Sequence, residues 1–205
     1  MQQSAALLVI DLQNDFCPGG ALAVPGGDTI FPLVNRLAQK FTTVILTQDW
    51  HPASHISFAA NHPGRQPFET TELPYGTQVL WPTHCVMGTP GAALHPGLAI
   101  PHANAILRKG LNPRVDSYSA FLEADRTTKT GLDGYLSSRG IRDVYLCGLA
   151  TDYCVAWSAE DSRKFGFNAT VLEDACRAIN LNDSLRLAWE RLAAAGVARL
   201  TSAQL

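Results

Sequence analysis

The stretch CGLATDYCV, residues 147–155, decides the fold, because it joins an apolar run to a helix start. Residues 143–147 (DVYLC) are typical of a buried strand, and Thr151-Asp152 is a suitable beginning for a helix. A helix N-terminus favours negative charge and lowers the pKa of a thiol. Cys154 is therefore a candidate nucleophile, which needs a base, an oxyanion site and a substrate pocket elsewhere in the chain.

Short apolar runs rich in β-branched residues recur on both sides of this stretch. The predicted strands are 5–10, 43–47, 104–108, 143–147, 168–172 and 198–201. The predicted helices are 29–40, 128–139, 152–165 and 183–195, the last capped by Asn182 or Asp183. Alternation of strands and helices predicts a parallel sheet covered on both faces, which is a three-layer α/β fold.

Residues 48–103 break this alternation. The segment is rich in Pro, Gly, His and Trp and shows little periodicity. A loop of this length inside a compact domain is usually functional. The 205 residues contain no internal repeat and no clear linker, so we expect one domain, 1–205, with a functional insertion at about 48–103.

Composition excludes several classes of partner. The formal net charge is -2 without a Lys/Arg cluster, which argues against nucleic acid and anionic membranes. The apolar runs are too short for a membrane span, and residues 1–12 lack the basic start of a signal peptide. Five cysteines without a C-x-x-C pair indicate free thiols in a reducing cytoplasm. The oligomeric state cannot be read from the sequence.

Reactive side chains follow four of the predicted strands. These are Asp11, the Asp49-Trp50-His51 segment, Lys109 and the Cys154 segment. Because ligands of open α/β sheets bind beyond the carboxyl ends of the strands, we expect these groups to meet. Asp11 could then accept the thiol proton, Lys109 could stabilise both anions, and N–H groups near Ala150 and Cys154 could face an oxyanion. This set fits attack on an amide carbonyl through a thioester.

The insertion offers ligands for a metal ion. Asp49 and His51 are two residues apart, so both side chains point the same way from an extended segment. His55 and His84 follow, although His55 could equally hold the loop in place. Carboxylate and imidazole ligands suit Zn, Fe or Mn better than Ca or Mg. We therefore expect one divalent metal ion.

The chain resembles the nicotinamidases, also called pyrazinamidases, of the isochorismatase-like cysteine hydrolase family. The resemblance is carried in order by five stretches: DLQNDFCPGGALAV (11–24), TQDWHPASHISFA (47–59), WPTHCVMGTPGAALHP (81–96), KGLNPRVDSYSAF (109–121) and GLATDYCV (148–155). It implies hydrolysis of nicotinamide to nicotinate and ammonia, with a sheet order of 3-2-1-4-5-6.

The resemblance also implies a role for each matched residue. The catalytic triad is Asp11, Lys109 and Cys154. The metal ligands are Asp49, His51 and His84, with His55 as a candidate fourth. The pyridine ring is expected among five side chains, which are Phe16, Leu22, Trp81, Tyr118 and Tyr153. The oxyanion hole is expected at the N–H groups of Ala150 and Cys154, beside a cis peptide between Leu149 and Ala150. The other four cysteines, Cys17, Cys85, Cys147 and Cys176, are assigned to packing.

Other functions remain open on the residues alone. The nearest is hydrolysis of another small amide or carbamoyl compound by the same triad. Cleavage of a vinyl ether, as in isochorismatases, fits less well because a nucleophilic Cys and metal ligands are both present. A non-catalytic flavodoxin-like binding protein would need a phosphate-binding Gly loop, and the PGG segments do not match one. A purely structural zinc site would need closely spaced Cys/His ligands, and this sequence lacks them.

Overall fold

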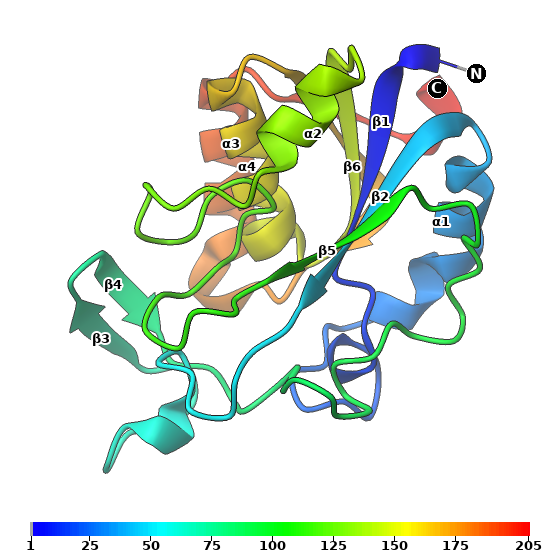
Figure 1. The fold of residues 1–205 in the computed structure, drawn as a ribbon. Helices are drawn as coiled ribbons and strands as arrows, with labels where there is room; N and C mark the ends of the chain where they lie inside the picture. Colours follow the sequence, from blue (N-terminus) through cyan, green and yellow to red (C-terminus); the bar gives the residue numbers. More distant parts are fainter. Residues whose placement is uncertain (1) are drawn as a thin grey trace.

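The computed structural model describes residues 2–205, which form an α/β fold around a six-stranded parallel sheet (Figure 1). Its strands are β1 (Gln2–Ile10), β2 (Phe41–Asp49), β5 (Ala105–Lys109), β6 (Asp143–Leu149), β7 (Asn168–Arg177) and β8 (Ala198–Leu200). Their order, β5-β2-β1-β6-β7-β8, is the predicted 3-2-1-4-5-6. All six predicted strands are confirmed, with ends that differ by up to five residues.

Four α-helices cover the sheet, and they are α1 (Phe31–Ala38), α2 (Leu132–Ser138), α3 (Ala156–Lys164) and α4 (Ser184–Ala194). Figure 1 shows α1 on one side of the sheet and α2, α3 and α4 on the other. This placement follows from right-handed crossovers, because the chain leaves β1 toward one edge and β6 toward the opposite edge. The three predicted layers are confirmed.

The helices begin later than the sequence predicted. A 3₁₀ turn, Gly27–Ile30, precedes α1, and Gly131 with φ 90° directly precedes α2. Before α3, residues Thr151–Val155 form a π-helical turn. Asp183 is the N-cap of α4, although its side chain accepts a hydrogen bond from Arg186 instead of capping the helix. Each difference arises at a helix end, where special backbone conformations replace regular ones.

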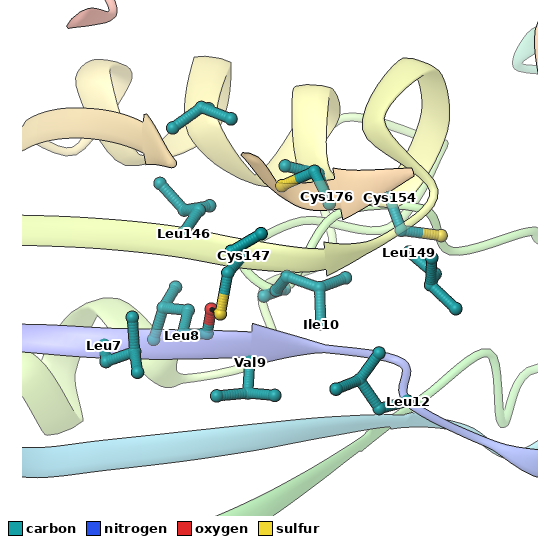
Figure 2. Close-up of a cluster of buried hydrophobic side chains, with 14 of the residues drawn as sticks. Leu7, Leu8, Val9, Ile10, Leu12, Leu146, Cys147, Leu149, Cys154 and Cys176 are labelled. Atoms are coloured by element: carbon teal, nitrogen blue, oxygen red, sulfur yellow. Dashed lines mark hydrogen bonds between the residues drawn. The ribbon is translucent and has the colours of Figure 1, made fainter. Parts of the chain in front are cut away.

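The core lies along β1 and β6, the two central strands. Residues 5–10 of β1 are all buried, and Leu8 pairs with Leu146 of β6. Figure 2 shows apolar side chains of both strands around Cys147, with Cys154 just beyond the end of β6. The Cys147 thiol donates to the Leu8 carbonyl at 3.8 Å. All five cysteines are buried and unpaired, which supports packing roles for the four outside the site.

The insertion contains structure that the sequence did not reveal. An antiparallel hairpin of β3 (Thr70–Leu73) and β4 (Gly76–Val79) projects away from the sheet (Figure 1). Its strands are short and mostly exposed, so they lack the alternating apolar pattern that predicts a strand. Between residues 2 and 205, the helices are too short or too polar to cross a membrane.

Candidate active site

Asp11, Lys109 and Cys154 meet beyond the carboxyl ends of the central strands, as predicted. The Lys109 Nζ lies 2.9 Å from Asp11 Oδ2 and 3.4 Å from Cys154 Sγ. It also forms an ion pair with Asp49 and donates to the Ser117 carbonyl at 2.9 Å. Lys109 is fully buried, so its charge acts at close range and without solvent screening.

Asp11 is fixed by its neighbours on the sheet. It directly follows β1 and adopts a φ of 49°, which turns the chain at the end of the strand. Its backbone N–H donates to Thr47 Oγ1 at 3.1 Å, and the Thr47 hydroxyl donates to Asp11 Oδ1 at 2.6 Å. Strand β2 therefore orients the carboxylate toward Lys109.

Cys154 is positioned by the end of β6 and the π-helical turn. The peptide between Leu149 and Ala150 is cis, as the family resemblance implied. Gly148 has a φ of 121°, and a Cβ there would overlap the carbonyl oxygen of Ile10. A glycine is therefore required for β6 to reach the Asp11 end of β1 this closely.

The electrostatics of the thiol differ from the sequence prediction. Burial raises the pKa of Cys154 well above its usual value, and the nearby Lys109 ammonium only opposes this shift. Burial also raises the pKa of Asp11 against the effect of Lys109. Burial disfavours the ammonium of Lys109, but Asp11 and Asp49 raise its pKa well above the usual range. Burial therefore opposes the low thiol pKa that the sequence predicted.

Asp49, His51 and His84 converge beside the triad, and Asp49 lies within 4.8 Å of both Asp11 and Cys154. The Asp49 Oδ2 lies 3.6 Å from His51 Nε2 and 3.9 Å from His84 Nε2. The other ring nitrogens face carbonyl oxygens, His51 Nδ1 at 3.0 Å from Gly110 and His84 Nδ1 at 2.7 Å from Pro82. A carbonyl only accepts, so each Nδ1 carries a proton and each Nε2 faces Asp49. Burial lowers the pKa of His51, but the neighbouring Asp49 raises it above the usual value.

This donor set fits a divalent metal ion such as Zn, Fe or Mn. Burial and the neighbouring His51 lower the pKa of His84 to about 4, so its imidazole is neutral at neutral pH. Burial disfavours ionised Asp49, but Lys109 and His51 bring its pKa well below the usual value. Two imidazole nitrogens and one carboxylate are a common ligand set for these metals.

The structure does not bring His55 into this group. Its Nδ1 accepts from the Ser57 backbone N–H at 3.4 Å and contacts the Ser57 hydroxyl at 2.7 Å. The proton of the neutral ring is therefore on Nε2, which lies 3.3 Å from the Val115 carbonyl. Burial and the charge of His51 lower the pKa of His55 to about 4. These contacts support the alternative role in the loop.

One small cavity is lined by both the Cys154 thiol and the three ligands. The five side chains predicted around the ring all line it, and they are Phe16, Leu22, Trp81, Tyr118 and Tyr153. Trp81 packs edge-on against Tyr153 with ring centroids 4.9 Å apart, and its indole N–H donates to the Tyr118 hydroxyl at 3.0 Å. Ala150 and Cys154 also line the cavity. The walls suit a small flat aromatic compound whose reacting group faces the thiol.

Sequence reasoning missed two lining residues, Asp116 and Ile179. Asp116 is an acidic residue two positions before Tyr118, inside a stretch that the sequence analysis had already singled out. That location is the one signal that could have drawn attention to it. Ile179 follows β7 in an irregular segment and carries no signal of its own.

Comparison with known proteins points to one family. The model of the isochorismatase domain matches residues 5–204. A nicotinamidase from Acinetobacter baylyi is 58% identical over 199 residues, which cover 97% of this chain and 93% of that protein. A solved structure described as a nicotinamidase/pyrazinamidase of Acinetobacter baumannii superposes with a TM-score of 0.99 at 59% identity, covering 100% of this chain and 99% of the other.

A structure of the pyrazinamidase of Pyrococcus horikoshii in complex with zinc is also similar. It superposes with a TM-score of 0.78 at 36% identity, and the match covers 97% of this chain and 99% of the other. The metal in that structure belongs to that protein. Its presence there agrees with the ligand chemistry of Asp49, His51 and His84 here.

Proposed function

The chain belongs to the isochorismatase family, and from this membership and the site geometry we propose that it is a nicotinamidase. The proposed reaction is hydrolysis of nicotinamide to nicotinate and ammonia. The observation that carries the proposal is one aromatic-walled cavity lined by Cys154 and by the three metal ligands, with Lys109 in contact with the thiol and Asp11 within 4.8 Å of it. In nicotinamide a single ring carbon separates the ring nitrogen from the carbon that bears the carboxamide, so one flat molecule could reach both the metal ligands and the thiol.

The substrate is bound and oriented before any bond changes. The faces and edges of Phe16, Trp81 and Tyr153 pack against the ring and exclude water. Asp49, His51 and His84 would hold the metal, which supplies a Lewis-acid position for a ring nitrogen when bound. Holding the carboxamide near the thiol can lower the barrier by several kcal/mol, on the order of 7 or more in favourable cases.

Attack begins with transfer of the thiol proton. The Cys154 sulfur forms a bond to the carbonyl carbon while Asp11 accepts its proton. Burial raises the pKa of Asp11, which makes its carboxylate a stronger base than an exposed one and suits it to this role. Lys109 stays charged and stabilises both anions as they form. The oxygen that becomes negative would be bound by the N–H groups of Ala150 and Cys154, which lie at the cavity wall.

Asp11 then returns the proton to the leaving nitrogen. Ammonia departs, and the acyl group stays on Cys154 as a thioester. A water molecule next gives a proton to Asp11 and attacks the thioester carbon. The carbon–sulfur bond breaks, the thiol regains its proton, and nicotinate is released. One carboxyl group thus acts as base and acid in both halves of the reaction.

Ammonia release from nicotinamide by the purified protein tests this proposal directly. We expect steady release by the wild-type chain, with loss of turnover in Cys154→Ala and in chelator-treated protein. Restoring zinc, iron or manganese should recover the treated sample. Absence of release from metal-supplied wild-type protein would reject nicotinamide, and other small amides and carbamoyl compounds would then be tested with the same assay.

The cellular setting that we propose is the cytoplasm, where this activity would serve recycling of pyridine nucleotides. The support is chemical, since all five cysteines are buried and unpaired, as suits a reducing compartment. Measurement of activity in separated cell fractions would check the location.

A further inference from the structure

Asp116 is a buried carboxylate at the cavity wall to which the proposed reaction assigns no role. It is 2% exposed and lies in the segment between β5 and α2. Its Oδ2 accepts from the Gln78 side-chain amide at 2.7 Å, and its Oδ1 accepts from the Ser117 backbone N–H at 2.8 Å. Both donors are neutral.

No lysine or arginine side chain balances this carboxylate. Between residues 2 and 205, no lysine or arginine nitrogen lies within 4.0 Å of Asp116. A buried charge without an opposite charge is costly, typically by several kcal/mol. The nearest basic groups are the rings of His51 and His55, and a cation bound beside them would balance the charge of Asp116.

The nearest place for such a cation is the proposed metal site. Asp116 and the ligands Asp49, His51 and His84 line the same cavity. The carboxylate of Asp116 and ring nitrogens of His51 and His55 lie within 4.8 Å of one another. Counting Asp11, Asp49 and Asp116 against Lys109 gives three acidic groups and one basic group. A divalent cation supplies the two missing positive charges.

A separate metal site at His51, His55 and Asp116 is disfavoured by the ring protons. The His51 Nδ1 donates to the Gly110 carbonyl, and its Nε2 faces Asp49. The His55 Nε2 carries a proton, as its contacts with Ser57 require. Asp116 thus acts on the ion at the Asp49 site from outside the ligand set.

We propose that Asp116 is a positioning residue for the metal ion, an outer carboxylate that raises the affinity of the Asp49, His51 and His84 site for a divalent cation. Its charge attracts the ion, and its oxygens can accept from water molecules bound to the metal. The inference rests on the metal site of the proposed function.

The hairpin β3–β4 fixes this carboxylate in place. Gln78 of β4 is 1% exposed, and its amide donates to Asp116, to the Val79 carbonyl at 2.7 Å and to the Tyr118 hydroxyl at 3.0 Å. The Tyr75 hydroxyl donates to the Gln78 side-chain oxygen at 3.1 Å. These bonds give the hairpin a function, which is to hold Asp116 and Tyr118 at the cavity wall.

Zinc affinity of the metal-free protein tests the proposal without any substrate. Competition with a chromogenic chelator would compare wild type, Asp116→Asn and the control Glu72→Gln, which removes an exposed charge from the same hairpin. We expect Asp116→Asn to weaken zinc binding about 10- to 100-fold, as loss of an outer partner does in other metal sites. Glu72→Gln should stay within about twofold, because an exposed charge is screened by salt. Equal affinities of Asp116→Asn and wild type would overturn the proposal.

Thermal unfolding separates this role from a structural one. Without metal, Asp116 is an unbalanced buried charge, so metal-free Asp116→Asn should melt at or above the temperature of metal-free wild type. A lower melting temperature, or failure of the variant to fold, would contradict the proposal. Wild-type protein that binds zinc but does not hydrolyse nicotinamide would reject the proposed function alone. Wild-type protein that binds no zinc would reject the metal site together with this role.

Discussion

Lys109 is the only lysine or arginine in direct contact with Asp11, Asp49 and Cys154 among the described residues, so its replacement is a sharp test. Lys109→Met removes the ammonium and leaves Asp11 and Asp49 facing each other inside the protein. We expect kcat to fall by several orders of magnitude, and unfolding to become easier by about 3–5 kcal/mol, because breaking a buried pair leaves a charge uncompensated.

Activity and chemical denaturation measured on the same preparation would check both effects. The matched control is Lys129→Met, since Lys129 is exposed and its ion pair with Asp133 lies at the surface. Wild-type turnover in Lys109→Met would show that Lys109 has no part in the reaction.

His55 and His84 carry their ring protons on different nitrogens, which predicts opposite effects on metal binding. His84 turns an Nε2 lone pair toward Asp49, whereas His55 has its lone pair on Nδ1, directed at Ser57. His84→Ala should lose nearly all bound metal, and His55→Ala should keep about one ion per chain. Elemental analysis of dialysed protein gives both numbers. Metal-free His55→Ala would make His55 a ligand after all.

Residue types explain which parts of the site the sequence could predict. Asp11 directly follows β1, Lys109 ends β5 and Cys154 lies in the turn after β6, and the carboxyl ends of parallel strands share one edge. The pKa of Cys154 could not be predicted, because it depends on burial. Asp116 could not be assigned either, since its importance comes from neighbours that lie close only in the folded chain.

Within the segment between β5 and α2, Glu123 links pH to stability. Its pKa is raised to about 7 by burial and by the nearby Asp125 and Asp116 carboxylates. A folded-state pKa above the unfolded value means that the folded chain holds this proton more tightly, so stability is lost as pH rises from about 4.5 to about 7. Glu123 is partly exposed, which reduces the expected loss to about 1 kcal/mol.

Glu123→Gln removes the titrating group and should therefore stabilise the protein at pH 8 but not at pH 4.5. Urea unfolding at the two pH values gives the comparison. A stability difference between variant and wild type that does not change with pH would remove Glu123 as the cause.

At the end of β6, close contact between strands depends on Gly148. Gly148→Ala would place a methyl group against the Ile10 carbonyl, and the strands would have to separate. We expect a loss of stability of about 1–3 kcal/mol from overpacking, with an additional cost from the φ of 121°. Activity should fall as well, because β1 carries Asp11 and β6 leads to Cys154.

Gly140→Ala is the matched control for this substitution. Gly140 also has a positive φ, of 68°, but a Cβ there would meet no atom within 4 Å. The Gly140→Ala variant should lose stability moderately and keep full activity. Equal loss of activity in the two variants would show that the spacing of β1 and β6 does not matter for catalysis.

Elements with a strong periodic pattern were predictable, and those defined by local backbone geometry were not. The six sheet strands contain short apolar runs, as is typical of parallel strands covered on both faces. The hairpin β3–β4 has one fully buried side chain, Gln78, so a pattern based on apolar residues misses it. The π-helical turn before α3 begins at the Ala150 carbonyl, which accepts from the N–H groups of Tyr153 and Val155, and no apolar pattern encodes these bonds.

Across the whole molecule, the alternation of strands and helices predicted the layers, but the strand order came from the family resemblance. Alternation is compatible with several orders, because a crossover can continue in either direction along the sheet. The order matters for function, since the reversal between β1 and β6 opens the crevice that holds Asp11 and Cys154. The insertion then closes this crevice with ligands from β2 and from the 81–86 segment.

Metal binding should therefore stabilise the molecule as a whole. The ligands Asp49, His51 and His84 come from the end of β2 and from the insertion, so an ion joins these parts only when the chain is folded. Zinc at about 100 times its dissociation constant should add about 2.7 kcal/mol, or roughly 5–10 °C in melting temperature for a chain of this size. Scanning calorimetry of metal-free protein at increasing zinc concentration measures the shift. His84→Ala should show almost none of it, and an equal shift in that variant would mean that zinc stabilises the fold from another place.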